Sequence, residues 1–83
     1  MHYPKIRNVT PSADKKLLVE FETGVRKTYD CTPLLNLPVF RPLQDEEFFR
    51  CAHADRAGYG VIWNDEIDLA ESEIWENGRV AET

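Results

Sequence analysis

An alternating segment near the N-terminus, residues 16–22, constrains the fold most. Apolar side chains occupy every second position, at Leu17, Val19 and Phe21. Glu20 follows Val19, and Glu22 follows Phe21. Because successive side chains of a strand point to opposite faces, a period of two predicts a half-buried β-strand. Gly24 follows, and glycine tolerates the positive φ that a tight hairpin turn requires. The segment therefore predicts one strand of a β-hairpin.

Two further segments complete a predicted three-stranded meander. Residues 25–30 are expected to return antiparallel to the first segment, with Val25 and Tyr29 facing the core. Residues 5–10 supply an earlier strand, and the loop-forming cluster at 11–14 separates it from the next one.

The middle of the chain predicts short helices. Thr32 before Pro33 is typical of an N-cap followed by proline at the first helical position, so residues 33–36 should form one helical turn. Pro38 and Pro42 are expected to keep the next stretch extended.

A second short helix is predicted after Asp45. This residue is placed as the N-cap, and two glutamates follow it near the positive end of the helix. The expected helix carries Phe48, Phe49 and Ala52.

A second hairpin is predicted from Cys51–Asp55 and Tyr59–Trp63, which flank a short turn ending in glycine. Residues 64–66 then form a polar turn. Asp68 and Glu71 have the spacing of a capping box, so a C-terminal helix should begin there.

The predicted C-terminal helix runs through Ile74 and Trp75 and stops at Asn77-Gly78, a common C-terminal signal. Residues 79–83 are expected to be a frayed tail. The order of elements includes no βαβ crossover. The predicted fold class is therefore α+β in a single domain spanning residues 1–83: a mainly antiparallel sheet from the meander and the second hairpin, with short helices and a C-terminal helix.

The charge balance limits the kinds of partner. The chain of 83 residues has 15 acidic and 10 basic residues, so its net charge is −5. An acidic surface repels phosphate, which argues against direct binding of nucleic acid and favours a basic protein partner. The N-terminal sequence lacks the apolar region of a signal peptide, and no apolar run is long enough to span a membrane. We therefore expect a cytoplasmic protein that does not bind membranes.

Cysteine and histidine are the first candidates for chemistry. Cys51 and His53 would share one face of a strand, and Cys31 or His2 could approach them. Structural zinc usually requires paired short spacings such as C-x₂-C, and this sequence has none. A Cys–His nucleophile would also need a third group to orient the imidazole. We expect no metal, no cofactor and no catalytic residue, and both cysteines are predicted to be small buried side chains.

Carboxylates near the second hairpin form a second candidate group. Asp55, Asp65 and Glu66 gather there, close to the predicted cap Asp68. Paired carboxylates can act as acid and base, but nothing in this spacing perturbs them specifically. They are better interpreted as an electronegative docking patch.

Aromatic residues add to this patch. Trp63 and Trp75 are expected to be core residues, with an exposed interface as the alternative, and Tyr59 is the aromatic residue expected to be most exposed. The candidate residues for protein interaction are Asp55, Tyr59, Trp63, Asp65 and Glu66.

Several short segments occur in an order typical of a known family. They are Leu18–Gly24, Tyr29-Asp30, Pro33–Leu35, Phe40 with Leu43, Phe48, Gly60–Trp63 and Glu66–Leu69. Their joint order and spacing resemble the bacterial Domain of Unknown Function 2442 family over nearly the whole chain. The resemblance implies a small α+β module without an assigned reaction, and it offers no catalytic residues to carry over.

The same resemblance implies two possible roles. Members are encoded beside proteins of the Domain of Unknown Function 4160 family, which suggests a two-gene toxin–antitoxin arrangement. Other members carry a helix-turn-helix segment after this module. We therefore expect a non-enzymatic, antitoxin-like module that binds a small basic protein encoded nearby. The alternative is a ligand-sensing or regulatory domain that forms a homodimer through a sheet edge.

Overall fold

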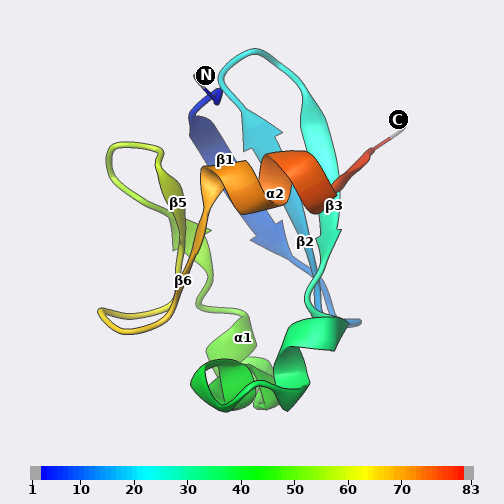
Figure 1. The fold of residues 1–83 in the computed structure, drawn as a ribbon, viewed down its shortest axis with the longest axis vertical. Coiled ribbons are helices and arrows are strands. Elements are labelled where there is room, and N and C mark those ends of the chain that lie inside the picture. The colour runs from blue at the N-terminus through cyan, green and yellow to red at the C-terminus, as the bar shows by residue number, and fades with distance from the viewer. Residues whose placement is uncertain (1–2, 82–83) are drawn as a thin grey trace.

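The computed structural model describes residues 3–81 and contains two antiparallel sheets (Figure 1). The first sheet has the strand order β1-β2-β3-β7, and the second has the order β4-β5-β6. The strands are β1 (Ile6–Pro11), β2 (Lys16–Phe21), β3 (Arg26–Asp30), β4 (His53–Ala54), β5 (Gly60–Ile62), β6 (Asp68–Ala70) and β7 (Arg79–Val80). The predicted α+β class with mainly antiparallel sheet is confirmed.

Within residues 3–81, four helical segments complete the fold. They are the 3₁₀ helices η1 (Thr32–Asn36) and η2 (Pro38–Gln44), and the α-helices α1 (Glu46–Phe49) and α2 (Glu71–Asn77). In Figure 1, α2 crosses in front of the first sheet, while α1 and the 3₁₀ segments form the lower end of the molecule.

The predicted meander is confirmed in β1, β2 and β3. Leu17, Val19 and Phe21 are fully buried on the inner face of β2, as their alternation predicts. The turn after β2 places Gly24 at φ +89°, a left-handed conformation that favours glycine. Tyr29 is buried as expected, but Val25 precedes β3 and is only half-buried.

The structure differs from the prediction in the proline-rich middle of the chain. Pro38 and Pro42 do not keep it extended, because both lie in η2. The 3₁₀ hydrogen bonds run from Phe40 N–H to the Leu37 carbonyl (3.0 Å) and from Asp45 N–H to the Pro42 carbonyl (3.2 Å). Neither bond needs a proline N–H, and the fixed proline φ suits a 3₁₀ turn. The prolines therefore stiffen this helix.

The caps of the short helices are partly as predicted. Asp45 is the N-cap of α1, and its carboxylate accepts a hydrogen bond from the Glu47 N–H (3.1 Å). Ala52 lies beyond the end of this helix, although it is buried. Thr32 is the first residue of η1 and not its cap; its N–H donates to the Asp30 carboxylate (2.9 Å).

The predicted capping box at Asp68 is wrong. Asp68 lies in β6 opposite Ile62, and the N-cap of α2 is Ala70, which makes no side-chain capping bond. The buried Leu69 between two exposed neighbours has the period of a strand, and pairing with β5 buries it. Here the pairing of β6 with β5 overrides a local capping signal.

The end of the chain also differs from the prediction. We expected residues 79–83 to fray, but Arg79 and Val80 form β7 beside β3, and Ala81 N–H donates to the Arg26 carbonyl (2.8 Å). Residues 82–83 lie outside the described part of the chain. Gly78 ends α2 as predicted, and it has an extended backbone. A Cβ there would lie 2.6 Å from the Ile74 carbonyl oxygen, so glycine is required for space.

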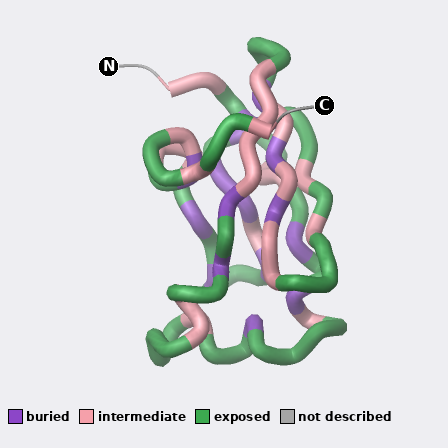
Figure 2. Tube along the Cα trace, turned by 90° about the vertical axis from the view of Figure 1, so that its right-hand side faces the viewer, coloured by how far each residue is buried: buried purple, intermediate pink, exposed green. Residues whose placement is uncertain are grey.

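The core lies between the two sheets. Its buried side chains form one cluster that draws on both sheets, α1, α2 and η2. Figure 2 shows buried residues along the inner strands, whereas the chain at the lower end is mostly exposed. The start of β1 joins the sheets, because Ile6 N–H donates to the Gly58 carbonyl (2.8 Å) and the Lys5 carbonyl accepts from Glu22 N–H (2.8 Å).

Candidate protein-binding surface

The turn between β5 and β6 presents two of the predicted carboxylates to solvent. Asp65 and Glu66 are both exposed. The Asn64 side-chain oxygen accepts hydrogen bonds from the N–H groups of Glu66 (2.8 Å) and Ile67 (2.9 Å). Ile67 is buried, so this end of the turn is fixed to the core. The local geometry therefore holds both carboxylates outward.

The Asp55 side chain stabilises the turn of the preceding hairpin. Its half-buried carboxylate accepts from the N–H groups of Ala57 (3.0 Å) and Tyr59 (3.4 Å), which closes the turn between β4 and β5. Tyr59 is 57% exposed, and the Lys5 ammonium lies 5.2 Å from the centre of its ring. Tyr59 also lies next to the start of α2, because its carbonyl accepts from Glu71 N–H (3.0 Å).

Trp63 does not belong to the surface. It is 4% exposed, and its indole N–H donates to the Phe49 carbonyl (3.1 Å). The two rings pack with their centres 6.2 Å apart. The choice of Trp63 as a candidate interaction residue is wrong, because this side chain, which follows β5, packs against Phe49 of α1. The expectation of a core position is the one that the structure supports.

Trp75 fixes α2 to the first sheet. Its half-buried ring meets Phe21 edge-on at 5.1 Å, and the Lys27 ammonium lies 4.0 Å above its centre. Lys27 also donates to the Trp75 carbonyl. These contacts stabilise the position of a helix of only seven residues, which would not be stable alone.

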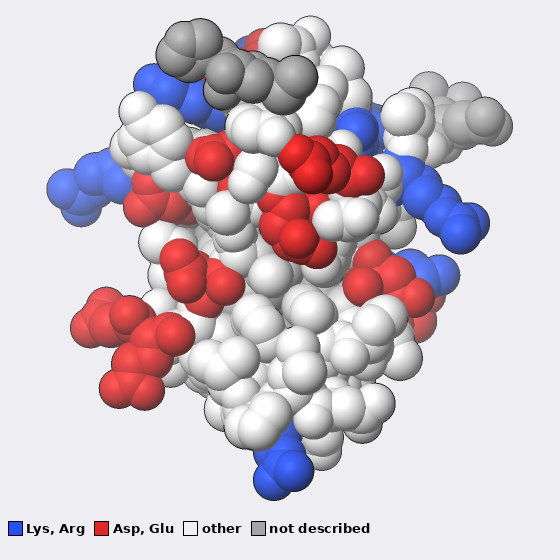
Figure 3. Space-filling view, viewed as in Figure 1, with Lys and Arg blue, Asp and Glu red and all other residues white. Residues whose placement is uncertain are grey.

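Sequence reasoning missed the carboxylates of α2. Figure 3 shows acidic side chains across the middle of the face on which α2 lies. Glu73 accepts a hydrogen bond from the Tyr29 hydroxyl (2.9 Å), and Glu76 accepts one from Tyr3. Burial, with the neighbouring Glu73, raises the pKa of Tyr29 far above its ordinary value. No salt bridge among residues 3–81 involves Glu73 or Glu76. We call Asp65, Glu66, Glu73 and Glu76 the acidic face.

A second surface, which the sequence analysis also missed, lies on the 3₁₀ segments. We call it the apolar cap and define it as Leu34, Leu35, Leu37, Val39 and Phe40. Leu37 is 47% exposed and Val39 is 53% exposed, and the other three are half-buried. Residues 31–40 include no charged side chain, and this run is the sequence signal that could have identified the cap.

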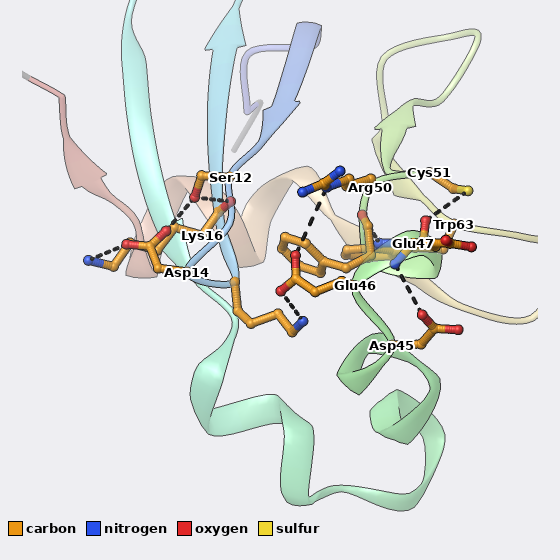
Figure 4. Close-up of polar contacts among 11 residues, drawn as sticks. Ser12, Asp14, Lys16, Asp45, Glu46, Glu47, Arg50, Cys51 and Trp63 are labelled. Atoms are coloured by element: carbon orange, nitrogen blue, oxygen red, sulfur yellow. Dashed lines mark hydrogen bonds and ion pairs between the residues drawn. The ribbon is translucent and has the colours of Figure 1, made fainter.

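Carboxylates of α1 border the apolar cap. Glu46 forms an ion pair with the Lys15 ammonium (2.6 Å) and lies 4.0 Å from Arg50. Figure 4 shows Glu46 directed toward the loop between β1 and β2, while Asp45 lies on a different side of the helix. Asp45 and Glu47 are exposed and take part in no salt bridge within residues 3–81. Counting Arg41 of η2, the charged side chains around the cap are three cations and three anions, so their charges balance.

The two cysteines differ in their surroundings. Cys31 is fully buried, and burial raises the pKa of its thiol to about 12. Cys51 was also expected to be buried, but it is exposed, because it follows α1 on the solvent side; its thiol lies 3.5 Å from the Glu47 carbonyl. His53 contacts the Cys51 carbonyl through Nδ1 (2.9 Å). Within residues 3–81, no three His, Cys, Asp or Glu side chains are grouped so that they could hold a metal ion.

A cavity of about 240 Å³ lies where β7 meets β3. It is lined by Lys16, Thr28, Asp30, Asn77 and Arg79. Lys16 already contacts Asp14 at 3.5 Å, and the hydrogen bond from the Thr32 N–H lowers the pKa of Asp30. The charges of this cavity therefore nearly balance, and they favour no particular ion.

None of the helices within residues 3–81 has the length and apolar character needed to cross a membrane.

Comparisons with known proteins identify a family without adding a function. Searches of curated proteins and of solved structures gave no match. The model of the family Protein of unknown function (DUF2442) matches residues 6–80, which confirms the resemblance carried by the sequence segments described above. The chain therefore belongs to the DUF2442 family.

Proposed function

We propose that this chain is a non-enzymatic module that binds a small basic protein. The observation that carries the proposal is the acidic face, where exposed carboxylates of α2 and of the turn between β5 and β6 lie free of salt bridges within the described residues. Together with the net charge of −5, this face attracts a cationic surface and orients it during encounter. Tyr59, exposed beside the start of α2, supplies an aromatic contact at its edge.

The more specific form of the proposal concerns the identity of the partner. We propose an antitoxin-like role in a bacterial cytoplasm, with a protein of the Domain of Unknown Function 4160 family, encoded nearby, as the partner. Family membership and the acidic balance of charge support this form. The chain would then act by covering the partner's surface.

Co-expression with the neighbouring gene product tests the proposal. We expect a complex that elutes as one species in size-exclusion chromatography. The double variant Asp65→Lys, Glu66→Lys should lower the association rate at low salt by about tenfold, because electrostatic steering depends on such exposed charges. The matched control is Glu22→Lys, an exposed acid in the hairpin between β2 and β3, with an expected change below about twofold. Failure of the wild-type chain to form any complex would refute the proposal.

A second candidate, a regulatory domain that forms a homodimer, is favoured by one observation. Arg26 and Ala81 form a hydrogen-bonded pair, so the N–H and C=O of Val80 point away from β3. Val80 is also 67% exposed. An open strand edge of this kind can pair with the same edge of a second copy. Sedimentation equilibrium of the purified chain would support this alternative with a dimer mass that falls to a monomer in Val80→Pro.

A further inference from the structure

The cavity between β3 and β7 lies on the face of the first sheet that turns away from the core. Lys16 is the register partner of Asp30 across β2 and β3, and Thr28 is that of Arg79 across β3 and β7. Tyr29, between Thr28 and Asp30 in the sequence, is buried, so its two neighbours point to the opposite face of the sheet. Pairing of the strands therefore brings these four polar side chains together from three strands.

Two cations line this cavity, and they differ in their surroundings. The Lys16 ammonium lies 3.5 Å from the Asp14 carboxylate, a contact that Figure 4 shows, and the Ser12 hydroxyl donates to the same carboxylate. Arg79 is exposed, and within residues 3–81 it takes part in no salt bridge. The guanidinium of Arg79 is therefore the cation that is available to a ligand.

Asp30 supplies the negative charge of the cavity. The Thr32 N–H donates to its carboxylate (2.9 Å), and this hydrogen bond lowers the pKa of Asp30, so the group is ionised at neutral pH. In the described part of the chain, no salt bridge joins this carboxylate to Lys16 or to Arg79. One positive and one negative group without an ion pair among the described residues therefore line the same small cavity.

This lining suits a ligand that carries both signs of charge. A simple anion would meet Arg79 but also Asp30, and a simple cation would meet Asp30 but also Arg79 and Lys16. An α-amino acid carries its carboxylate and its ammonium on one carbon atom, and a guanidinium binds a carboxylate through two parallel N–H donors. The Thr28 hydroxyl and the Asn77 amide add donors. The cavity is smaller than the roughly 300–1,000 Å³ of pockets for drug-sized molecules, which fits so small a ligand.

We propose that this cavity binds a free α-amino acid, with the carboxylate of the ligand on Arg79 and its ammonium on Asp30. The inference goes beyond the proposed function and does not depend on it, because no residue of the acidic face lines the cavity. The ligand bridges β3 and β7. Binding should therefore hold β7 against β3 and slow hydrogen exchange of the Ala81 N–H, which donates to the Arg26 carbonyl (2.8 Å).

Titration of the isotope-labelled full chain with each standard L-amino acid, followed by NMR of the backbone amides, tests the inference. We expect at least one amino acid to shift the amides of Thr28, Asp30 and Arg79 with saturation. Analogues of that ligand that lack one charged group should bind at least about tenfold more weakly, because each loses one charge-assisted contact. For L-alanine these analogues are propionate, which lacks the ammonium, and ethylamine, which lacks the carboxylate.

Charge variants locate the site. Asp30→Asn, which keeps an acceptor for the Thr32 N–H, and Arg79→Gln should each weaken binding at least about tenfold. The matched controls are Glu22→Gln and Arg56→Gln, exposed residues outside the cavity, with expected changes below about twofold. Circular dichroism checks the folding of each variant, and the analogues decide the question on the wild-type chain alone. Absence of saturable shifts with every amino acid, propionate binding as tightly as L-alanine, or binding unchanged in both folded charge variants would overturn the inference and leave the proposed function standing.

Discussion

Replacing Trp63 by phenylalanine tests whether this tryptophan supports the fold or a surface. The change removes the indole N–H that donates to the Phe49 carbonyl (3.1 Å). That carbonyl also accepts from Ala52 N–H (3.2 Å), so the loss is one net hydrogen bond, about 1 kcal/mol. The smaller ring leaves a cavity of roughly 40 Å³, which at about 24 cal/mol per Å³ costs about 1 kcal/mol more. We expect a total loss of about 2 kcal/mol in the free energy of unfolding.

Urea unfolding followed by far-ultraviolet circular dichroism measures this loss directly. For a domain of this size the same change lowers Tm by roughly 8–16 °C. Trp75→Phe leaves Trp63 as the only tryptophan, and its fluorescence should be blue-shifted and resistant to quenching by iodide. A Trp63→Phe variant as stable as wild type, together with red-shifted and quenchable emission from Trp63, would refute the placement of this side chain in the core.

Four further predictions concern single glycine, lysine and cysteine residues. Gly78→Ala should cost about 2 kcal/mol or more of stability in urea unfolding, because its Cβ would meet a carbonyl oxygen at 2.6 Å, whereas Gly24→Ala has open space and should cost about 1 kcal/mol through its positive φ alone. Lys15→Ala should cost about 1 kcal/mol, since it removes a partly exposed ion pair to α1, and the loss should shrink at 1 M salt in the same assay. The raised pKa of Cys31 means that the folded chain holds this proton when the unfolded chain has released it, so stability should fall as pH rises from about 9 to about 12. Iodoacetamide should label Cys51 well before Cys31, as mass spectrometry would show, and equal rates would contradict the burial.

The sequence predicts those parts of the fold that local patterns determine. Leu17, Val19 and Phe21 define a strand by themselves, and Gly24 defines its turn, so the meander could be predicted. The strand β7 has two residues, and it exists because Arg79 pairs with Thr28 far away in the sequence. Such short strands carry no periodicity of their own, so only long-range pairing reveals them.

The exposed surfaces also include features that the local sequence determines and features that tertiary contacts determine. The exposure of Asp65 and Glu66 could be predicted, because a polar turn presents its side chains to water whatever surrounds it. Whether Trp63 faces inward depends on its packing against Phe49 of α1, which no pattern within the hairpin specifies. The apolar cap depends on tertiary structure as well, because an uncharged run is equally compatible with a buried segment.

The positions of the α2 carboxylates in the acidic face depend on the packing of α2 against the core and the first sheet. Its helix α2 has seven residues and no side-chain cap at its N-terminus, so it cannot hold its carboxylates in place alone. Ile74 is fully buried, and Lys27 both donates to the Trp75 carbonyl and lies over its ring. The Tyr29 hydroxyl binds Glu73 from the sheet side, which fixes one carboxylate of the acidic face directly. The surface carboxylates of α2 and the packing beneath them are thus coupled through β3. Variants that loosen the packing of Trp75 should therefore let the carboxylates of α2 move from these positions before the domain unfolds.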